Sequence, residues 1–101
     1  MTVVSKRLGR GGLTTSSAAL YTVPANTTTI IKAITICNSG NTPVTFDLSF
    51  HSIWFAYEHT MKPNDTLTIP NVDQILTAGE AIRGKASNAN VTYHISGKEV
   101  I

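Results

Sequence analysis

Residues 20–50, LYTVPANTTTIIKAITICNSGNTPVTFDLSF, contain β-branched and aromatic runs that are separated by clusters of Pro, Asn and Gly. Such runs favour extended strands, and the residues between them favour tight turns. The clearest alternation lies at 44–50, where apolar Val44, Phe46 and Leu48 are interleaved with more polar residues. Hydrophobicity with a period of two is typical of a strand that has one buried and one solvated face. The stretch therefore predicts an antiparallel β protein.

Further strand patterns occur along the chain. Segment 29–37 is apolar on both of its alternating faces, which predicts a central strand that is covered on both sides. Segment 51–57, HSIWFAY, fits a strand, a bulged strand or an exposed contact surface, and we expect a strand. The other expected strands are 20–23, 66–69, 81–86 and 91–95, the last two joined as a hairpin. Seven or eight short strands at this spacing predict an all-β fold, an antiparallel β-sandwich or a jelly roll.

The length and composition are those of one domain. The chain has 101 residues, and charged residues make up only 14% of them, against about 25% in an average protein. Thr, Ser and Asn supply the missing polarity, and such side chains suit a sheet surface that is buried against another subunit. No apolar run has the signal-peptide form or the roughly 20 residues of a membrane span. We therefore expect a soluble protein with no membrane partner.

Residues 1–17 differ from the rest and predict a flexible basic arm before a β-sandwich domain at 18–101. Lys6, Arg7 and Arg10 alternate with glycines, and the remaining chain has five Lys and Arg against six Asp and Glu. Three interpretations are open: an arm that binds a neighbouring subunit, a disordered tail, or an arm that contacts nucleic-acid phosphates. No aromatic residue accompanies the cations, so we expect no specific nucleic-acid recognition. Four apolar residues favour the first interpretation because they could anchor the arm: Val3, Val4, Leu8 and Leu13.

Three segments in a fixed order resemble a recurrent small domain of tailed-bacteriophage structural proteins. The shared features are a Tyr-x-Val-Pro-Ala-Asn start, a strand that ends in Cys-Asn, the segment NDTLTIP, and a Gly-x-x-Ile-x-Gly-x-Ala motif near the end. The resemblance covers residues 20–98 and leaves out the basic arm. It implies a β-sandwich that repeats around a symmetric particle, as a tail, neck or baseplate element or as a protein that decorates the head.

The sequence contains no residue pattern typical of a catalytic or metal site. Cys37, His51, His59 and His94 lack the spacing of two to four residues by which one turn presents two zinc ligands. Cys37 ends an apolar strand, where a free cysteine usually acts as a small hydrophobic residue. The six carboxylates are dispersed and form no close pair of the kind that glycosidases use. We expect no enzyme activity, no cofactor and no metal.

Segment 53–57 concentrates aromatic residues. If Ile53, Phe55 and Tyr57 point into the sandwich, regular alternation places Trp54 outside. An exposed Trp can contact another subunit or stack on a sugar ring, whereas a loop that covers it would make it part of the core. We favour contact with another subunit.

The resemblance implies a bacteriophage virion protein that is made in the host cytoplasm, and the residue patterns predict that it is not an enzyme. It would form symmetric homo-oligomers and dock on larger tail, neck or head proteins. The interface would combine the cations and apolar anchors of the arm with Trp54 and Tyr57. The alternative is a carbohydrate-binding module for host-surface glycans, in which Trp54, Tyr57 and Tyr93 would stack on sugar rings.

Overall fold

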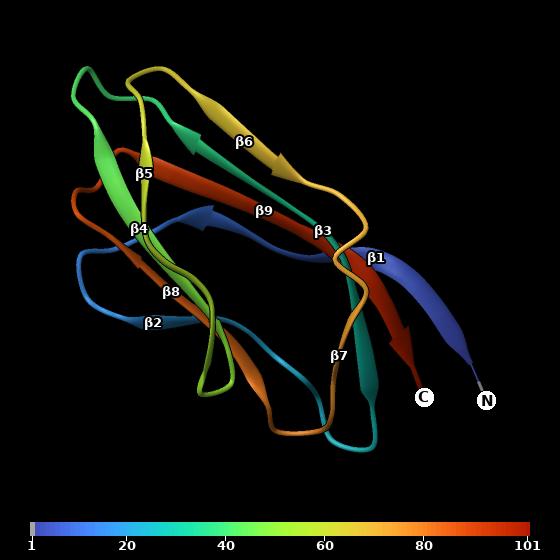
Figure 1. Ribbon diagram of the computed structural model, residues 1–101. Helices are drawn as coiled ribbons and strands as arrows, with labels where there is room; N and C mark the ends of the chain where they lie inside the picture. Colours follow the sequence, from blue (N-terminus) through green and yellow to red (C-terminus); the bar gives the residue numbers. More distant parts are fainter. Residues whose placement is uncertain (1) are drawn as a thin grey trace.

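The computed structural model describes residues 2–101, which form strands and connecting turns only (Figure 1). The strands are β1 Val3–Gly12, β2 Ala18–Thr22, β3 Thr28–Asn38, β4 Val44–Phe50, β5 Ile53–Met61, β6 Thr66–Ile69, β7 Gln74–Leu76, β8 Ala81–Ala86 and β9 Val91–Val100. Sheet A has the order β1-β9-β3-β6, with β7 also paired to β3, and sheet B has the order β2-β8-β4-β5. No helix that could cross a membrane occurs in this part of the chain.

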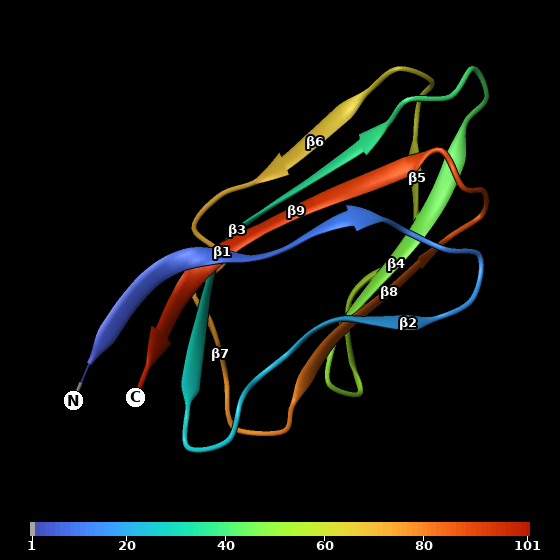
Figure 2. The same ribbon diagram turned by 180° about the vertical axis from the view of Figure 1, so that it is seen from behind.

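The two antiparallel sheets form a β-sandwich with jelly-roll connections, which confirms the predicted fold class (Figures 1 and 2). β6 and β7 both pair with β3, so they act as two halves of one edge strand. The chain crosses between the sheets at most connections, as in a jelly roll. The predicted hairpin of segments 81–86 and 91–95 is wrong, because β8 belongs to sheet B and β9 to sheet A. Turn residues at 87–90 indicate a change of direction but not which sheet the chain enters next.

The core lies between the inner faces of the sheets. β4 contributes Phe46 and Leu48, and β3 contributes Ile34 and Ile36, all of them fully buried. Burying each such side chain contributes about 1.5–3 kcal/mol. The remaining buried apolar side chains are Leu13, Val23, Ile31, Val44, Met61, Leu76, Ile82, Ala86, Val91 and Ile95.

The N-terminal segment is a strand of sheet A, so the prediction of a separate flexible arm over 1–17 is wrong for residues 3–13. β1 pairs antiparallel with β9 along its whole length, from Val3 opposite Val100 to Gly12 opposite Thr92. Leu13, directly after β1, is only 2% exposed. The glycines and cations of this segment are not typical of a strand. The segment is a strand because it pairs with β9, which lies at the other end of the chain.

Sheet A bends around Gly97 of β9. The ladders that join β9 to β1 and to β3 both shift register at positions next to this glycine. A Cβ atom on residue 97 would overlap the backbone carbonyl oxygen of Ile30 and crowd the side chain of Leu8. Glycine is therefore required for the three strands to approach this closely.

The register shift in β3 explains why both alternating faces of this strand are apolar. Before the shift the buried positions are Thr29 and Ile31, and after it they are Ile34 and Ile36, so the inner face passes from odd to even residues. β3 is central, as predicted, since β9 pairs on one side and β6 and β7 on the other. Its outward side chains are only half buried, so the predicted cover on both sides is wrong.

We expect Leu13→Ala to lower the free energy of unfolding by about 2–5 kcal/mol, because it opens a cavity in the core. Val3→Ala, on the exposed side of the same segment, should change it by less than about 0.5 kcal/mol. Urea denaturation followed by tryptophan fluorescence measures both values. Deletion of residues 1–13 should abolish cooperative unfolding, and an unchanged transition after this deletion would contradict the assignment of β1 to the sandwich.

Candidate functional site

Large apolar side chains are exposed on β5, which is an edge strand of sheet B. Ile53, Trp54 and Tyr57 are 71%, 58% and 60% exposed, and we call these three residues the aromatic patch. The rings of Trp54 and Tyr57 lie together, with centroids 4.8 Å apart and planes tilted by 54°. Exposed aromatic side chains on one strand are typical of contact sites for other proteins.

An irregular β4–β5 ladder brings Trp54 and Tyr57 to the same face. The register is Phe50↔Ile53, Ser49↔Trp54, Leu48↔Ala56 and Phe46↔His59. Phe55 is therefore an extra residue between two successive pairs. In a regular strand Trp54 and Tyr57, three residues apart, would lie on opposite faces, and the extra residue places them on the same face. The prediction that Ile53, Phe55 and Tyr57 point inward together is wrong, because only Phe55 of the three is partly buried. Trp54 points outward, as expected.

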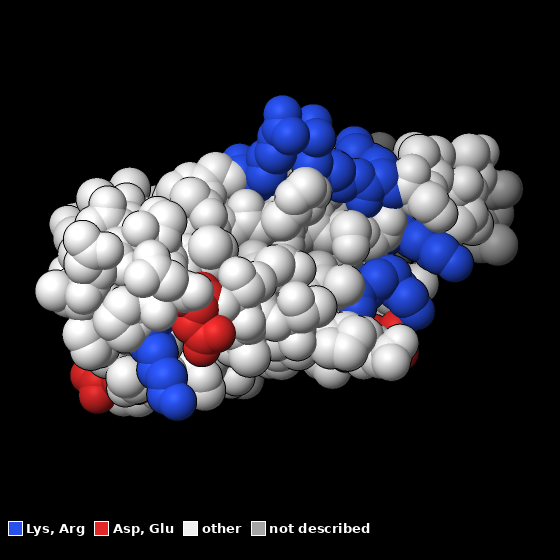
Figure 3. Space-filling model, turned by 90° about the horizontal axis from the view of Figure 1, so that it is seen from above, with Lys and Arg blue, Asp and Glu red and all other residues white. Residues whose placement is uncertain are grey.

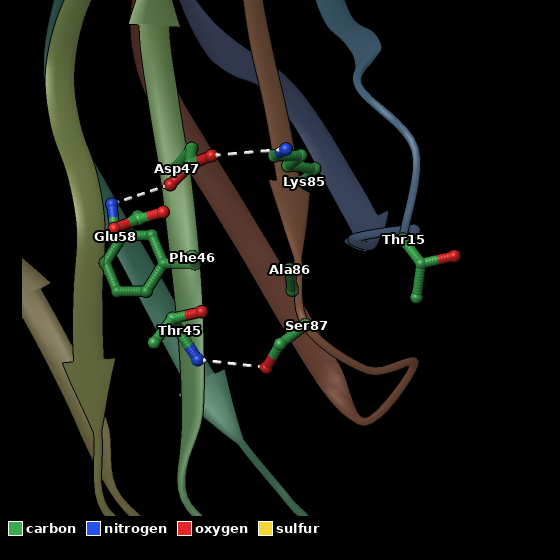
Figure 4. A pocket seen from close by; sticks show the side chains of 8 residues that line it. All are labelled: Thr15, Thr45, Phe46, Asp47, Glu58, Lys85, Ala86 and Ser87. Atoms are coloured by element: carbon green, nitrogen blue, oxygen red, sulfur yellow. Dashed lines mark hydrogen bonds and ion pairs between the residues drawn. The ribbon is translucent and has the colours of Figure 1, made fainter.

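A second bulge in β5 is held by a buried carboxylate. Asp47 Oδ1 accepts a hydrogen bond of 2.6 Å from the backbone N–H of Glu58, and Asp47 Oδ2 lies 3.7 Å from Lys85 Nζ (Figure 4). Glu58 has a φ of 49°, a left-handed conformation that is costly for a residue with a side chain. Asp47 offsets this cost and fixes the position of the adjacent Tyr57. The prediction that this face of β4 is solvated is wrong here, since Asp47 is only 5% exposed.

Two small cavities share Asp47 and Lys85 on the outer face of sheet B. The larger, of about 210 Å³, is lined by Thr15, Thr45, Phe46, Asp47, Glu58, Lys85, Ala86 and Ser87 (Figure 4). The smaller, of about 80 Å³, is lined by Ser17, Asp47, Ser49, Trp54, Arg83, Gly84 and Lys85. Pockets that enclose a small molecule usually have about 300–1,000 Å³. This face therefore offers a Trp beside polar side chains rather than an enclosed site.

The other predicted interface residues lie at the opposite edge of the sandwich. β1 is an edge strand of sheet A and contacts β2, which is one edge strand of sheet B. β5 is the other edge strand of sheet B, so β1 and β5 lie at opposite edges of the sandwich. Val3, Val4, Lys6, Arg7 and Arg10 are exposed, whereas Leu8 packs against the core and Leu13 is part of it. The structure thus divides between two edges the residues that the sequence suggested for one interface.

Cys37 and His94 are diagonal neighbours on the outer face of sheet A. Such neighbours are about 7–8 Å apart, and no hydrogen bond joins them within residues 2–101. His51 lies in the β4–β5 turn, and His59 lies on β5 of sheet B. Among the described residues, no three His, Cys, Asp or Glu side chains come together as metal ligands.

A hydrogen-bonded cluster around Glu99 of β9 joins the two sheets. Glu99 Oε2 accepts a hydrogen bond of 2.6 Å from the Tyr21 hydroxyl, and Oε1 lies 3.2 Å from Lys6 Nζ. The Tyr21 oxygen is also 2.7 Å from Thr29 Oγ1. The hydrogen bond from Tyr21 lowers the pKa of Glu99, while burial and the bond to Glu99 raise the pKa of Tyr21 to about 12. This cluster fastens β2 of sheet B to three strands of sheet A.

Comparison with known proteins finds similarity of fold but not of sequence. No protein-family model and no curated protein matches the chain. The NLP core of Drosophila, a protein described in terms of pentamer formation and histone binding, is 15% identical over 95% of this chain and 100% of its own, with a TM-score of 0.55. At this identity the likeness shows the fold alone.

Two crystal structures of pentameric capsid proteins isolated from metagenomic phage sequences also match weakly. They are 11% and 9% identical over 96% of this chain, with TM-scores of 0.37 and 0.31. The match spans 59% and 60% of their own lengths. TM-scores of this size carry no structural argument.

We expect Asp47→Ala to lower the free energy of unfolding by about 1–3 kcal/mol, because the Glu58 N–H would lose its buried acceptor. Asp65→Ala is the matched control, since Asp65 accepts a backbone hydrogen bond from Thr66 at an exposed position, and it should cost less than about 1 kcal/mol. Urea denaturation measures both. Amide exchange at Glu58 should accelerate only in Asp47→Ala, and equal protection in both variants would show that Asp47 does not hold the bulge.

The Glu99 cluster predicts a pH dependence of stability. Because the pKa of Glu99 lies below its ordinary 4.5, its contribution is present above pH 4.5 and is lost as the pH falls through the folded-state pKa. The raised pKa of Tyr21 contributes stability below pH 10, which is lost as the pH rises towards about 12. Tyr21→Phe should lower the free energy of unfolding by about 1.5–3 kcal/mol near neutral pH.

The difference between wild type and Tyr21→Phe should shrink below pH 4.5, where the contribution of Glu99 is lost, and above pH 10, where the contribution of Tyr21 is lost. Denaturant titrations across this range measure it. Tyr57→Phe, which removes an exposed hydroxyl, is the control and should stay within about 0.5 kcal/mol of wild type. A Tyr21→Phe effect that does not vary with pH would contradict the role of the pair.

Proposed function

We propose that this protein is a non-enzymatic structural subunit that associates with copies of itself. The observation that carries the proposal is the aromatic patch, three large exposed side chains on an edge strand. An edge strand leaves backbone groups unpaired on one side, and exposed apolar groups beside it favour pairing with another chain. A partner that covers β5 would satisfy both the backbone and the aromatic side chains.

A second apolar group lies at the opposite edge. Val3, Val4 and Ile101 are 52%, 39% and 61% exposed, and mutual backbone hydrogen bonds between Thr2 and Ile101 keep the two chain ends together. We call Val3, Val4 and Ile101 the β1-edge patch. Two apolar patches on opposite edges suit a head-to-tail contact, in which the aromatic patch of one copy covers the β1-edge patch of the next. Repetition of a head-to-tail contact closes into a ring when the rotation per subunit allows it.

The assembly that we propose is part of a tailed-bacteriophage virion, made in the host cytoplasm and docked on larger tail, neck or head proteins. The resemblance of residues 20–98 to small domains of phage structural proteins supports this assignment. The low charge content of 14% supports it as well, because fewer charges must be desolvated when subunits meet. Repetition around a ring would strengthen contacts that are weak between two copies.

Histone binding, which is described for the NLP core, does not suit this chain. Histones are basic, and this protein has a formal net charge of +2 at pH 7. Like charges repel during association and slow it. We therefore carry over only the fold from that protein.

The lack of enzyme activity is part of the proposal and is supported by how the reactive side chains are used. The Asp47 carboxylate is engaged by Glu58 and Lys85, and the Glu99 carboxylate by Tyr21 and Lys6. Both carboxylates are occupied in holding strands together, which leaves them without a free position for substrate.

Carbohydrate binding is the second candidate, and one observation favours it. Trp54 lies beside the small cavity that Ser49 and Arg83 also line. A sugar ring can stack on Trp while hydroxyl and guanidinium groups bind its oxygens. A glycan array in which binding disappears in Trp54→Ala, with self-association unchanged, would favour this function over assembly.

We expect the wild type to form concentration-dependent oligomers and Trp54→Ala to weaken each contact about 30-fold, as expected for an interface residue worth about 2 kcal/mol. Sedimentation velocity over a range of concentrations measures the association. Ile75→Ala is the matched control, because Ile75 is 64% exposed on β7 and belongs to neither patch. A strictly monomeric wild type would contradict the proposal.

A mixing experiment tests the head-to-tail geometry. Trp54→Ala/Tyr57→Ala and Val3→Ser/Val4→Ser should each be monomeric alone, since each lacks one side of the contact. A mixture of the two should form heterodimers, because each variant keeps the side that the other lacks. Native mass spectrometry resolves these species. If Val3→Ser/Val4→Ser assembles like wild type, the contact does not involve the β1-edge patch.

A further inference from the structure

The outer face of sheet A gathers cations from both ends of the chain. Arg7 is opposite Ser96, Arg10 is opposite His94, and Lys98 is opposite Ser5. Neighbouring rows on one face of a sheet are about 7 Å apart along the strand. The three cations therefore form a short stripe over β1 and β9, which we call the basic stripe. In Figure 3, one group of Lys and Arg at the upper edge of the molecule has no Asp or Glu beside it, whereas Lys and Arg elsewhere in this view have Asp or Glu next to them.

The cations of the basic stripe are not neutralised by carboxylates. Within residues 2–101 the ion pairs join Lys6 to Glu99, Lys32 to Asp73 and Lys85 to Asp47, and none includes a member of the stripe. The outward positions of β1, β9 and β3 in the described register hold no Asp or Glu. The positive charge of this face is therefore available to an anionic partner.

The surroundings of the stripe suit phosphate groups. Arg10 and His94 line an open depression of about 380 Å³ together with Thr35 and Thr92. Hydroxyl groups of Ser and Thr, like Arg and Lys, are common donors to the phosphates of nucleic acids.

We propose that the basic stripe binds the phosphate backbone of duplex DNA without reading its sequence. Neighbouring phosphates of one DNA strand are farther apart than their axial rise of about 3.4 Å, because the backbone winds around the helix axis. Their separation is close to the row spacing of about 7 Å, so successive cations can meet successive phosphates. Of the aromatic side chains that line the depression, Tyr93 packs against the core and His94 alone lies at an outward position, which leaves little surface for stacking on unpaired bases and favours a duplex over a single strand.

This partner is separate from the proposed self-association. The aromatic patch and the β1-edge patch share no residue with the basic stripe. A single copy supplies the three charges, so binding by a monomer is expected. A ring would add avidity by presenting several stripes to one duplex.

The test is fluorescence anisotropy with a labelled duplex of about 20 base pairs, with Trp54→Ala/Tyr57→Ala as the monomeric background. Release of counterions from about three phosphates predicts an affinity loss of about 80-fold between about 20 and 100 mM salt. Arg10→Gln should reduce this loss to about 18-fold, because one phosphate contact is removed. Arg7→Gln/Arg10→Gln/Lys98→Gln should abolish binding.

Lys62→Gln is the charge-matched control. Lys62 is exposed in the β5–β6 turn and forms no ion pair within the described residues, so its substitution should leave both the affinity and the salt dependence unchanged. Equal losses in Lys62→Gln and Arg10→Gln would overturn the proposal, since net charge alone would then explain binding. Tighter binding of single-stranded DNA or of polyglutamate than of the duplex would also overturn it. DNA binding is measured on Trp54→Ala/Tyr57→Ala, which is expected to be monomeric, so the result does not depend on whether the wild type self-associates.

Discussion

The pairing of β9 with both β1 and β3 is the constraint on which the rest of the structure depends. It joins the first strand of the chain to the last and places β9 between β1 and the central strand β3 of sheet A. The close approach of the three strands requires the missing side chain of Gly97. The register shifts around this glycine then decide which residues of β3 face the core, because each shift of one residue exchanges the two faces of a strand. The choice of core residues in β3 and the bend of sheet A thus both depend on Gly97.

A register shift also decides which side chains of sheet B are exposed. The extra residue Phe55 places Trp54 and Tyr57 side by side on the surface instead of on opposite faces. Asp47 stabilises the adjacent bulge from below by accepting the Glu58 N–H. A buried carboxylate therefore shapes the exposed surface, since the aromatic patch depends on a strand irregularity that a regular ladder would remove. Bulges are the means by which this small sandwich presents contact residues.

Edges and faces of the sandwich carry different chemistry. The edge strands β1 and β5 expose apolar side chains, while the outer face of sheet A carries the basic stripe and that of sheet B carries polar groups beside Trp54. Apolar edges suit association of like subunits, and a flat cationic face suits a polyanion. The proposed self-association and the proposed binding of DNA would thus use different residues.

The sequence by itself determined the strands and the fold class. Alternation at Val44, Phe46 and Leu48 specified β4, because every second side chain of a strand faces the same way. Turn chemistry likewise bounded β6 and β8, whose limits agree with the prediction. Trp54 is exposed as expected, although Ile53 and Tyr57, which that argument placed inside, are exposed as well. These features are local, so a short stretch of sequence contains the information.

Only the tertiary structure decided pairing, register and the grouping of surface residues. Residues 3–12 read as an arm because the strand that they pair with is far away in sequence. Arg7 and Lys98 meet on one face for the same reason, and Asp47 is buried only because a bulge of β5 closes over it. A one-residue bulge leaves no clear mark in composition or periodicity, yet it reverses the direction of every side chain that follows.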